Sequence, residues 1–469
     1  MFSDIFDYNE RMIDSYFRTD MNYDVVNTRF TAVGRKAKLY FVDGFINSET
    51  SQDVMGYLMR LDGIAEKIQT PEQLAEKMIP YIEMELCDDI EKIAGVFYSG
   101  AMLLIIDGFD TGFLIKTRAY PRRSVEEPDN DKVLRGAHDG FVESLLINTA
   151  LIRRRIRDRE LIMEVHKAGV RSKTDIAMCY LKNKTDEKII DNLRKRIDEI
   201  DVNTLNMSQE SLVECLIKKQ KLNPFPKVRY TERPDAAAAC IAEGSIIVLI
   251  DNSPVALIVP TSFFEFLQDT NDYYFPPTIG TYLRLVRGLI FFLALFLSPV
   301  WYLIVRNVEY MPDWLHFIVV KEPYSIPIIA QLFIIEMVID TLKMASLNTP
   351  NSLSNSFSVI GALVLGELAV SAQLFTSEVV LIMAFVAIAN FAQPSFELGY
   401  AFKLSRMFIL LMTAFFNVWG FVAGTLAVIL VMAFTKTLTG RGYLFPLVPF
   451  NAKALSRLLI RRSISKDNT

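Results

Sequence analysis

Long apolar runs without charge constrain the fold of this chain more than any other feature. Residues 288–305, 379–396 and 407–435 contain no Asp, Glu, Lys or Arg. A helix needs about 20 apolar residues to cross the ~30 Å hydrocarbon core of a bilayer. The buried core of a soluble protein accounts for one such run, but not for three so close together. We therefore predict an all-α polytopic membrane domain over residues 281–450, with four to six helices.

The distribution of charge divides the chain at the same point. Residues 281–469 contain 14 Lys and Arg and 9 Asp and Glu, against 36 and 45 in residues 1–280. The first part is therefore predicted to be an acidic soluble region, and the second to be apolar and mildly basic. The N-terminus, MFSDIFDYNERMID, has neither a basic nor an apolar signal region, so we expect internal segments to direct membrane insertion.

Two stretches of the soluble region follow the same order of elements. SGAMLLIIDGFDTGFLI (99–115) and EGSIIVLIDNSPVALIV (243–259) both read as a hairpin, and each is preceded by a strand followed by a helix. Directly before the first stretch we also expect residues 93–98 to form a strand. We predict two similar α/β units, over 37–119 and 173–262, although chance similarity of two hairpins remains an alternative.

The predicted organisation is an α/β soluble N-terminal region of two similar α/β units followed by the all-α membrane domain. Its segments are a helical N-terminal segment (1–36), the first α/β unit (37–119), a charged bridging segment and helix (120–172), the second α/β unit and joint (173–280), the membrane domain (281–450) and a basic cytoplasmic tail (451–469).

The bridging segment is dense in charge of both signs. A catalytic interpretation of His138 with Asp139 and Glu143 fails because no nucleophile or orienting group accompanies them. Two interpretations stay open: a solvated linker, or a latch of paired charges between subdomains or subunits. The candidate latch residues are Arg122, Arg123, Glu126, Glu127, Arg135, Arg153, Arg154 and Arg155.

No motif indicates catalysis or a cofactor. Gly136 and Gly140 do not form a GxGxxG, no GxxxxGK[ST] occurs, and the four cysteines lack CxxC or histidine partners at metal spacing. The arginines of the bridging segment lie in an acidic region without interleaved aromatics, which argues against nucleic acid as a partner. We therefore expect no enzyme activity, no cofactor and no metal.

Ionisable residues inside the apolar part are the candidate functional groups there, because such residues tend to face a bundle interior or water. Glu336, Asp340 and Lys343 share one helical face, and Glu397 follows Pro394. One interpretation is that Glu336, Asp340 and Glu397 mark helix ends or interhelical pairs. The other is an acidic path that favours cations.

Basic residues predict the orientation of the membrane domain. Arg284 and Arg287 precede the first apolar run, and Lys343, Lys403 with Arg406, and the C-terminal tail are also expected on the cytoplasmic side. This implies an even number of crossings. The run 407–435 is long for one helix and short for two, and Asn417 and Gly420 are positions at which it would break.

Six motifs give the chain a resemblance to a known family. They are EEPDNDKVLRGAHDGFVESLLINTALIRRRIR (126–157), RSKTDIAMCYL (171–181), NPFP (223–226), TERPDAAAACIAEG (231–244), SVIGALVLGELAV (358–370) and FAQPSFELGYAF (391–402). The chain resembles the A subunits of spore germinant receptors, the GerA-type proteins. Receptor-type members usually have proline at Ala137, and this difference, with the PRRSVEEPDNDK run, points to the SpoVAF branch.

The resemblance implies a multi-pass protein of the spore inner membrane, with its N-terminal domain on the cytoplasmic (core) side. It also implies assembly with other membrane subunits of the germination machinery, and a homo-oligomeric channel or receptor-type subunit that contributes to ion release. A non-conducting scaffold and a carrier subunit are the alternatives.

The segment 358–370 is the candidate pore lining, because its small residues allow helices to approach closely. In an oligomer, Glu367 would concentrate cations and Leu365 or Val364 would close the path. An ordinary packing seam is the alternative, and the lining would then lie in 325–343. The candidate pore or gate residues are Ser358, Gly361, Ala362, Leu365, Gly366 and Glu367.

Overall fold

The computed structural model describes residues 2–46, 48–60, 68–78, 84–116, 136–205, 207–217, 223–269, 271–320, 324–348, 369–438, 440 and 442–460. The chain divides into two compact units. The first comprises residues 1–219 and 228–261, and the second comprises 220–227 and 262–469.

The first unit begins with a five-stranded antiparallel sheet in the order β1-β2-β4-β5-β3. Its elements are α1 (Phe6–Phe17), β1 (Val25–Ala32), β2 (Arg35–Val42), α2 (Ser48–Arg60), α3 (Pro71–Met78), β3 (Met84–Cys87), α4 (Ile90–Phe97), β4 (Met102–Ile106) and β5 (Gly112–Ile115).

Helices cover both faces of this sheet because successive strand side chains point to opposite sides. Tyr40 on β2 packs in a cluster with Phe17 of α1 and Phe97 of α4. The neighbouring Leu39 packs in a second cluster with Leu58 of α2. The strands β4 and β5 are buried along their whole length, which explains their nearly uniform apolar sequence.

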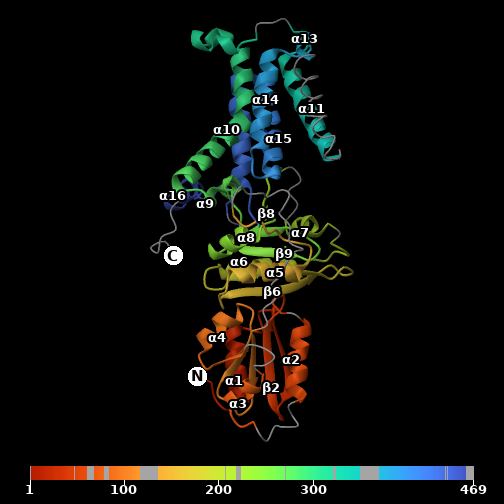
Figure 1. Ribbon diagram of the computed structural model, residues 1–469. Helices are drawn as coiled ribbons and strands as arrows, with labels where there is room; N and C mark the ends of the chain where they lie inside the picture. Colours follow the sequence, from red (N-terminus) through yellow and green to blue (C-terminus); the bar gives the residue numbers. More distant parts are fainter. Residues whose placement is uncertain are drawn as a thin grey trace. The chain divides into compact units, whose positions relative to one another are not determined.

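A second five-stranded sheet in the same unit has the order β6-β7-β9-β10-β8, again antiparallel throughout. In Figure 1 the first sheet is red and orange, and the second is yellow and green. The elements of this second half are α5 (Leu145–Arg155), β6 (Leu161–Ala168), β7 (Thr174–Leu181), α6 (Glu187–Asp198), α7 (Ser208–Leu216), β8 (Arg229–Thr231), α8 (Pro234–Ala242), β9 (Ile246–Ile250) and β10 (Ala256–Val259).

The two halves have the same strand order and the same succession of elements, so the predicted repeat is confirmed. The likeness extends to single hydrogen bonds. The Asn9 side chain accepts a hydrogen bond from Ser3 N at 2.8 Å and donates one to Ser3 O at 2.5 Å. The Asn148 side chain forms the same two bonds with Val142, at the same two distances.

A second pair of bonds repeats in the same way. Asp107, after β4, accepts a bond from the first amide of α1, and Asp251, after β9, accepts one from the first amide of α5. Each repeat therefore fastens its leading helix to its central hairpin by the same device.

Three details differ from the sequence expectation. The segment 1–36 contains the strand β1 as well as the helix α1, and the bridging segment 120–172 contains the strand β6. Residues 90–97 form the helix α4, not a strand. The side chain of Asp89 caps α4 by accepting a bond from Glu91 N, and Ile93, Ala94 and Phe97 are buried on one face. Each repeat thus begins earlier than expected, at its leading helix.

The second unit is helical. Its elements are η2 (Phe263–Leu267), α9 (Asn271–Tyr274), α10 (Pro277–Arg306), η3 (Val308–Tyr310), η4 (Asp313–Ile318), α11 (Ile328–Asn348), α13 (Ala369–Ser371), α14 (Ser377–Phe391), α15 (Phe396–Phe434) and α16 (Ala452–Leu459). Within the described residues, α10 and α15 are long and apolar enough to cross a membrane, and α14 is a shorter apolar helix.

The long element α15 is two helices joined by a sharp break. Asn417 has non-helical backbone angles (φ 53°, ψ −132°), which separate residues 396–416 from 418–434. A Cβ atom on Gly424 would lie 3.3 Å from Ile409 Cα, so the second helix turns back along the first. Reciprocal amide bonds of 2.7 and 2.8 Å join Asn417 to Asn307 at the end of α10. This hairpin accounts for the awkward length of the run 407–435.

Candidate functional site

The helical unit gathers four charged side chains among apolar helices, and three of them are buried. Glu336 and Asp340 come from α11, and Lys403 and Arg406 come from the first half of α15. Arg406 is 0% exposed, Glu336 4% and Lys403 7%. Burial of unpaired charges at this level would be prohibitive, so their mutual contacts decide whether the unit is stable.

We call these four residues the charge network. Two of them are cations and two are carboxylates, and they contact one another. Arg406 Nη2 donates to Glu336 Oε1 at 2.7 Å, and Lys403 Nζ lies 3.3 Å from the same oxygen. Lys403 also donates to Asp340, and Arg406 Nη1 donates to the carbonyl of Ala294 in α10. Two cations thus balance two carboxylates, and the network connects three helices.

The exposed side of the charge network opens into a small hollow of about 30 Å³. This volume holds about one water molecule. Lys343 also lines the hollow, and its Nζ lies 4.7 Å from the ring centre of Tyr400 and 5.0 Å from that of Phe396. The side-chain oxygen of Asn390, another lining residue, is buried and has no hydrogen-bond partner among the described residues.

Lys403 and Arg406, predicted to lie on the cytoplasmic side of the membrane, are buried within the helical unit. Their role as partners of Glu336 was missed. The sequence does contain the signal, since Lys403 and Arg406 are three residues apart on one helix and Glu336 and Asp340 are four apart on another. Each pair therefore occupies one helical face.

Glu397 has a different place from the other predicted acidic residues. It is exposed in the first turn of α15 and accepts a bond from Ser395 Oγ at 2.8 Å. A carboxylate in the first turn interacts favourably with the helix dipole. The predicted pore or gate residues, Ser358, Gly361, Ala362, Leu365, Gly366 and Glu367, lie outside the described residues.

A buried ion pair joins α9 to α10. Asp272 is 0% exposed and accepts from Arg287 Nη1 at 2.8 Å and from Arg284 Nε at 3.4 Å. Arg284 Nη1 also donates to the carbonyl of Leu458 in α16. Sequence reasoning treated the two arginines as markers of orientation and missed their partner.

In the soluble unit, only some of the predicted latch residues are described by the structure. Arg122, Arg123, Glu126, Glu127 and Arg135 lie outside the described residues. Arg153, Arg154 and Arg155 lie at the end of α5.

Arg153 is buried completely and links the two repeats. Its Nε and Nη2 donate to Asp24 at 2.8 and 2.9 Å, and its Nη1 donates to the carbonyl of Leu161. Arg18 makes a second link between the repeats, to Glu160 at 2.9 Å.

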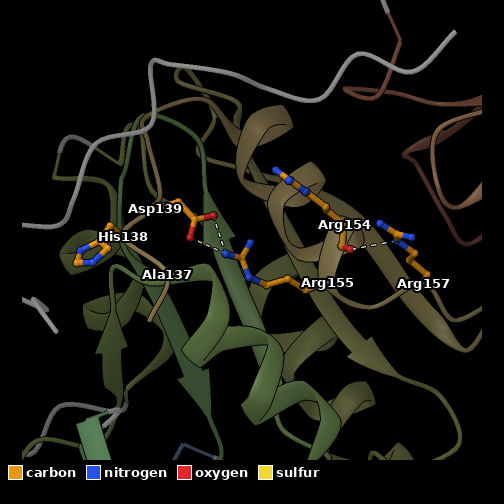
Figure 2. Close-up of a pocket in the computed structure, with 6 residues that line it drawn as sticks. All are labelled: Ala137, His138, Asp139, Arg154, Arg155 and Arg157. Carbon is orange, nitrogen blue, oxygen red and sulfur yellow. Dashed lines mark hydrogen bonds and ion pairs between the residues drawn. The ribbon is translucent and has the colours of Figure 1, made fainter. Parts of the chain in front are cut away.

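The other two arginines line an open hollow of about 620 Å³, together with Ala137, His138, Asp139 and Arg157. Figure 2 shows Arg155 extending from α5 to Asp139, with His138 on the far side of that carboxylate. Arg155 Nη2 donates to both oxygens of Asp139 at 2.6 Å.

Sequence reasoning also missed a polar cluster between β6, β7 and α6. Arg194 Nη2 donates to Glu164 at 2.8 Å, Tyr180 donates to the same carboxylate, and His166 Nδ1 lies 2.8 Å from Asp198. Burial alone would raise the pKa of Glu164, but its hydrogen bonds with His166, Arg194 and Tyr180 outweigh burial and hold that pKa at about 2. The Glu164 carboxylate, 3.5 Å away, raises the pKa of His166.

Glu164 and His166 lie two positions apart on β6 and therefore on one face of the sheet, a spacing that is common in strands, so the sequence held no specific signal for the cluster. Among the described residues, no group of three or more His, Cys, Asp or Glu side chains is arranged to hold a metal ion.

Comparison with known proteins places these features in a family. Residues 11–469 match the model of the Bacillus/Clostridium GerA spore germination protein family. The chain is 36% identical over 453 residues to Stage V sporulation protein AF of Bacillus subtilis (strain 168), covering 97% of this chain and 92% of that protein. It is 28% identical over 425 residues to Spore germination protein KA of the same organism, with 90% and 77% covered.

A solved structure is also similar in sequence. It is the crystal structure of the N-terminal domain of the A subunit of the Bacillus megaterium spore germinant receptor GerK3. It is 26% identical to this chain, covers 56% of this chain and 97% of that domain, and has a TM-score of 0.44. The motif-based resemblance is confirmed by the family match over nearly the whole chain and by the similarity to Stage V sporulation protein AF. The chain belongs to the GerA family of spore germination proteins.

Proposed function

We propose that this protein is a non-enzymatic, multi-pass subunit of an oligomeric assembly in the spore inner membrane, and that it contributes to ion release during germination. The names of its relatives support a role in germination or sporulation. The apolar helices α10 and α15 support a membrane location.

The charge network is the observation that carries the proposal of ion movement. Charged groups inside apolar helices are costly and mark ion paths or the elements that control them. Here Glu336 and Asp340 are matched by Lys403 and Arg406, so an acidic cation path through these four groups has no support from their net charge. The network is better suited to a lock that holds α10, α11 and α15 in one arrangement.

A lock of this kind has a clear physical basis. Removing one partner of a buried ion pair leaves the other charge uncompensated, which costs about 3–5 kcal/mol. The helices would then shift until water reaches the unpaired charge. We infer that the arrangement seen here is the closed one and that activation separates α11 from α15.

The positions of basic residues support a cytoplasmic side for the N-terminal region. Arg284 and Arg287 lie near the start of α10, and Lys436 follows α15. Cations on short segments next to membrane helices favour the cytoplasmic side. Other membrane subunits of the germination machinery are the proposed partners, since the relatives of this chain are named as spore germination proteins.

Ion flux through proteoliposomes tests the proposal. We expect the purified chain, reconstituted with the membrane subunits that co-purify with it, to release trapped monovalent ions. Glu336→Gln should increase the basal leak because Arg406 loses its carboxylate. Glu397→Gln is the matched control, since Glu397 is exposed at a helix start, and it should leave the leak unchanged.

The same measurement separates the alternatives. A scaffold predicts no flux from any reconstituted mixture, although the co-purifying subunits still bind. A carrier predicts flux that saturates with the concentration of one solute. Equal leak from Glu336→Gln and the unsubstituted chain, at equal amounts of folded protein, would show that the charge network is not a lock.

A further inference from the structure

A hollow within the helical unit lies at the end of α10, away from Arg284 and Arg287 at its start. It has a volume of about 590 Å³, which is within the usual range for small-ligand sites. Its wall is formed by the last turns of α10, by residues before and at the start of α11, and by Ala414 near the break in α15. The lining residues that bear on its chemistry are Tyr302, Val305, Arg306, Tyr324, Ile328 and Ile329.

Arg306 gives this hollow a positive charge that neutral acceptors hold in place. No other Lys or Arg, and no Asp or Glu, is found among the described lining residues. Arg306 Nη1 donates to the carbonyl of Thr413 at 2.8 Å and to that of Ala414. Its Nε and Nη2 have no hydrogen-bond or ion-pair partner in the part of the chain that the structure describes. Since a carbonyl orients a guanidinium without cancelling its charge, Arg306 keeps donors available at the wall.

A buried side chain holds the opposite wall of the hollow. Gln331 is fully buried, donates to the carbonyl of Ile326 at 2.7 Å and accepts a bond from the amide of Thr376 at 2.9 Å. The segment before α11, which includes Tyr324, is therefore fastened to the start of α14. The first turn of α11 also borders the hollow, and the positive end of a helix dipole favours a negative group there.

The hollow lies along α10 at a level that matches the headgroups of a bilayer. α10 is long and apolar enough to cross a membrane. At about 1.5 Å per residue, Arg306 is roughly 30 Å along the helix from Arg287, close to the thickness of the hydrocarbon core. Tyr302 and Tyr324 are of a residue type that is enriched at membrane interfaces. Only this depth rests on the proposed membrane location, since the shape and charge of the hollow do not depend on it.

We propose that this hollow binds the phosphodiester head of a membrane phospholipid, with Arg306 Nε and Nη2 donating to its phosphate oxygens. Guanidinium groups form paired, charge-assisted hydrogen bonds with phosphate. One guanidinium balances the single negative charge of a phosphodiester, whereas a phosphate monoester carries about −1.5 to −2 at neutral pH. Val305, Ile328 and Ile329 supply an apolar wall against which the acyl chains begin.

Binding of a soluble short-chain phospholipid to the detergent-solubilised full chain tests the site. The probe is tritiated dihexanoyl phosphatidylglycerol, counted on the immobilised chain, and tritiated glycerol phosphate is the comparison without acyl chains. We expect saturable binding of the lipid, and binding of glycerol phosphate that is weaker by about tenfold or more because its contacts with the apolar wall are missing. Arg306→Gln should weaken lipid binding about tenfold or more, because the charge-assisted bonds are lost.

Two further variants separate a specific site from charge attraction and from misfolding. Lys436→Gln is the matched control, since it removes one positive charge from an exposed residue that follows α15, and it should leave the affinity unchanged within about twofold. In Arg306→Lys, the ammonium can still donate to the carbonyls of Thr413 and Ala414 and preserve the hairpin of α15. It cannot form paired bonds with phosphate, so the affinity should fall about threefold or more.

Three outcomes would overturn the proposal. Equal loss of affinity in Arg306→Gln and Lys436→Gln would show general charge attraction. Unchanged affinity in the Arg306 variants, with the folded state verified by circular dichroism, would refute the site, and Arg306→Lys alone decides if Arg306→Gln does not fold. Equal affinity for glycerol phosphate and the lipid would exclude the phospholipid and leave a free phosphate as the ligand.

Discussion

At the scale of single residues, neighbouring side chains of the same type have very different roles. Arg153 is buried and joins two repeats through Asp24, whereas Arg154 is exposed one position later. The difference arises because successive residues on a helix are about 100° apart around its axis. A charge count along the sequence therefore overstates how alike the arginines of α5 are.

Replacing Arg153 by Met should destabilise the contact between the repeats by about 3–5 kcal/mol, because Asp24 would remain buried without a partner. Hydrogen exchange of the purified chain would show this as faster exchange in α5 and β1. Arg154→Met is the control, and it should change stability by no more than about 0.5 kcal/mol. Equal exchange rates in the two variants would contradict a structural role for Arg153.

His166 should make the soluble unit less stable as pH rises. The nearby carboxylates Glu164 and Asp198 raise the pKa of His166 in the folded state, against an opposing effect of burial. Its stabilisation is therefore complete below the unfolded pKa of about 6.5 and is lost as pH rises through the folded pKa. We expect the Tm of the purified chain to fall between about pH 6 and pH 8, and His166→Gln to flatten that slope.

The carboxylate of Glu164 has the opposite dependence at low pH. Its folded pKa of about 2 lies below the ordinary value of 4.5, so its contribution is present above that value and is lost as pH falls through about 2.

A His166→Gln Tm profile parallel to that of the unsubstituted chain over pH 6–8 would mean that His166 does not titrate in this cluster.

At the scale of elements, the hairpin in α15 determines how the apolar run 407–435 is used. Residues 396–416 present Lys403 and Arg406 to α11. Residues 418–434 then turn back and pack along residues 396–416. Arg306 at the end of α10 donates to the carbonyls of Thr413 and Ala414, which satisfies groups that the broken helix leaves without partners.

Gly420→Ala should open this hairpin or reduce its stability by about 1–3 kcal/mol. A Cβ atom at Gly420 would collide with the carbonyl oxygen of Met412, and a backbone atom cannot move aside cheaply. Gly288→Ala in α10 is the matched control, because a Cβ there meets nothing within 4 Å. Thermal unfolding of both variants in detergent provides the comparison, and equal melting temperatures would contradict a tight turn at this position.

At the scale of the whole molecule, a soluble unit of two repeats is covalently joined to a helical unit at three points of the chain. One connection is unexpected: residues 220–227, between α7 and β8, belong to the helical unit. There Asn223 Nδ2 donates to Thr435 Oγ1 at 2.6 Å, and Phe225 packs in a cluster with Phe402. The NPFP motif thus has a structural role at the end of α15.

The segment 358–370 stays the predicted pore lining, and its residues 358–368 lie outside the described residues. If Leu365 is a gate, Leu365→Ala should give proteoliposomes a constitutive ion leak, and Glu367→Gln should reduce cation flux without changing assembly. If the segment is a packing seam, Leu365→Ala should lower stability alone. Unchanged leak and unchanged flux in the two variants would move the lining to the 325–343 segment.

The acidic run before α5 stays the predicted latch. Replacing Glu126 and Glu127 together by Ala should leave the fold intact, since exposed ion pairs contribute about 0–1 kcal/mol each. Assembly or germination should nevertheless slow, because the pairs would orient subdomains or subunits. Germination kinetics of spores with this double variant measure the effect, and normal kinetics would leave the linker interpretation.

The sequence alone determined the periodic features of this protein. Uncharged runs marked the helical unit, because runs of that length rarely occur outside membrane helices, and turn residues between apolar runs marked both hairpins. The repeat also bears on the strand that was predicted at 93–98, where the structure has a helix. The Ala-rich helix α8 occupies the place in the second repeat that α4 occupies in the first, so the alignment of the two stretches argues for a helix at 93–98.

Only the tertiary structure decided which charges meet. Glu336 and Arg406 are 70 positions apart in the chain, and Asp24 and Arg153 are 129 apart. Helical periodicity places each charge on a face of its own helix, but it does not say which face of another helix lies opposite. That choice depends on the packing of whole helices and on the cost of leaving any buried charge without a partner.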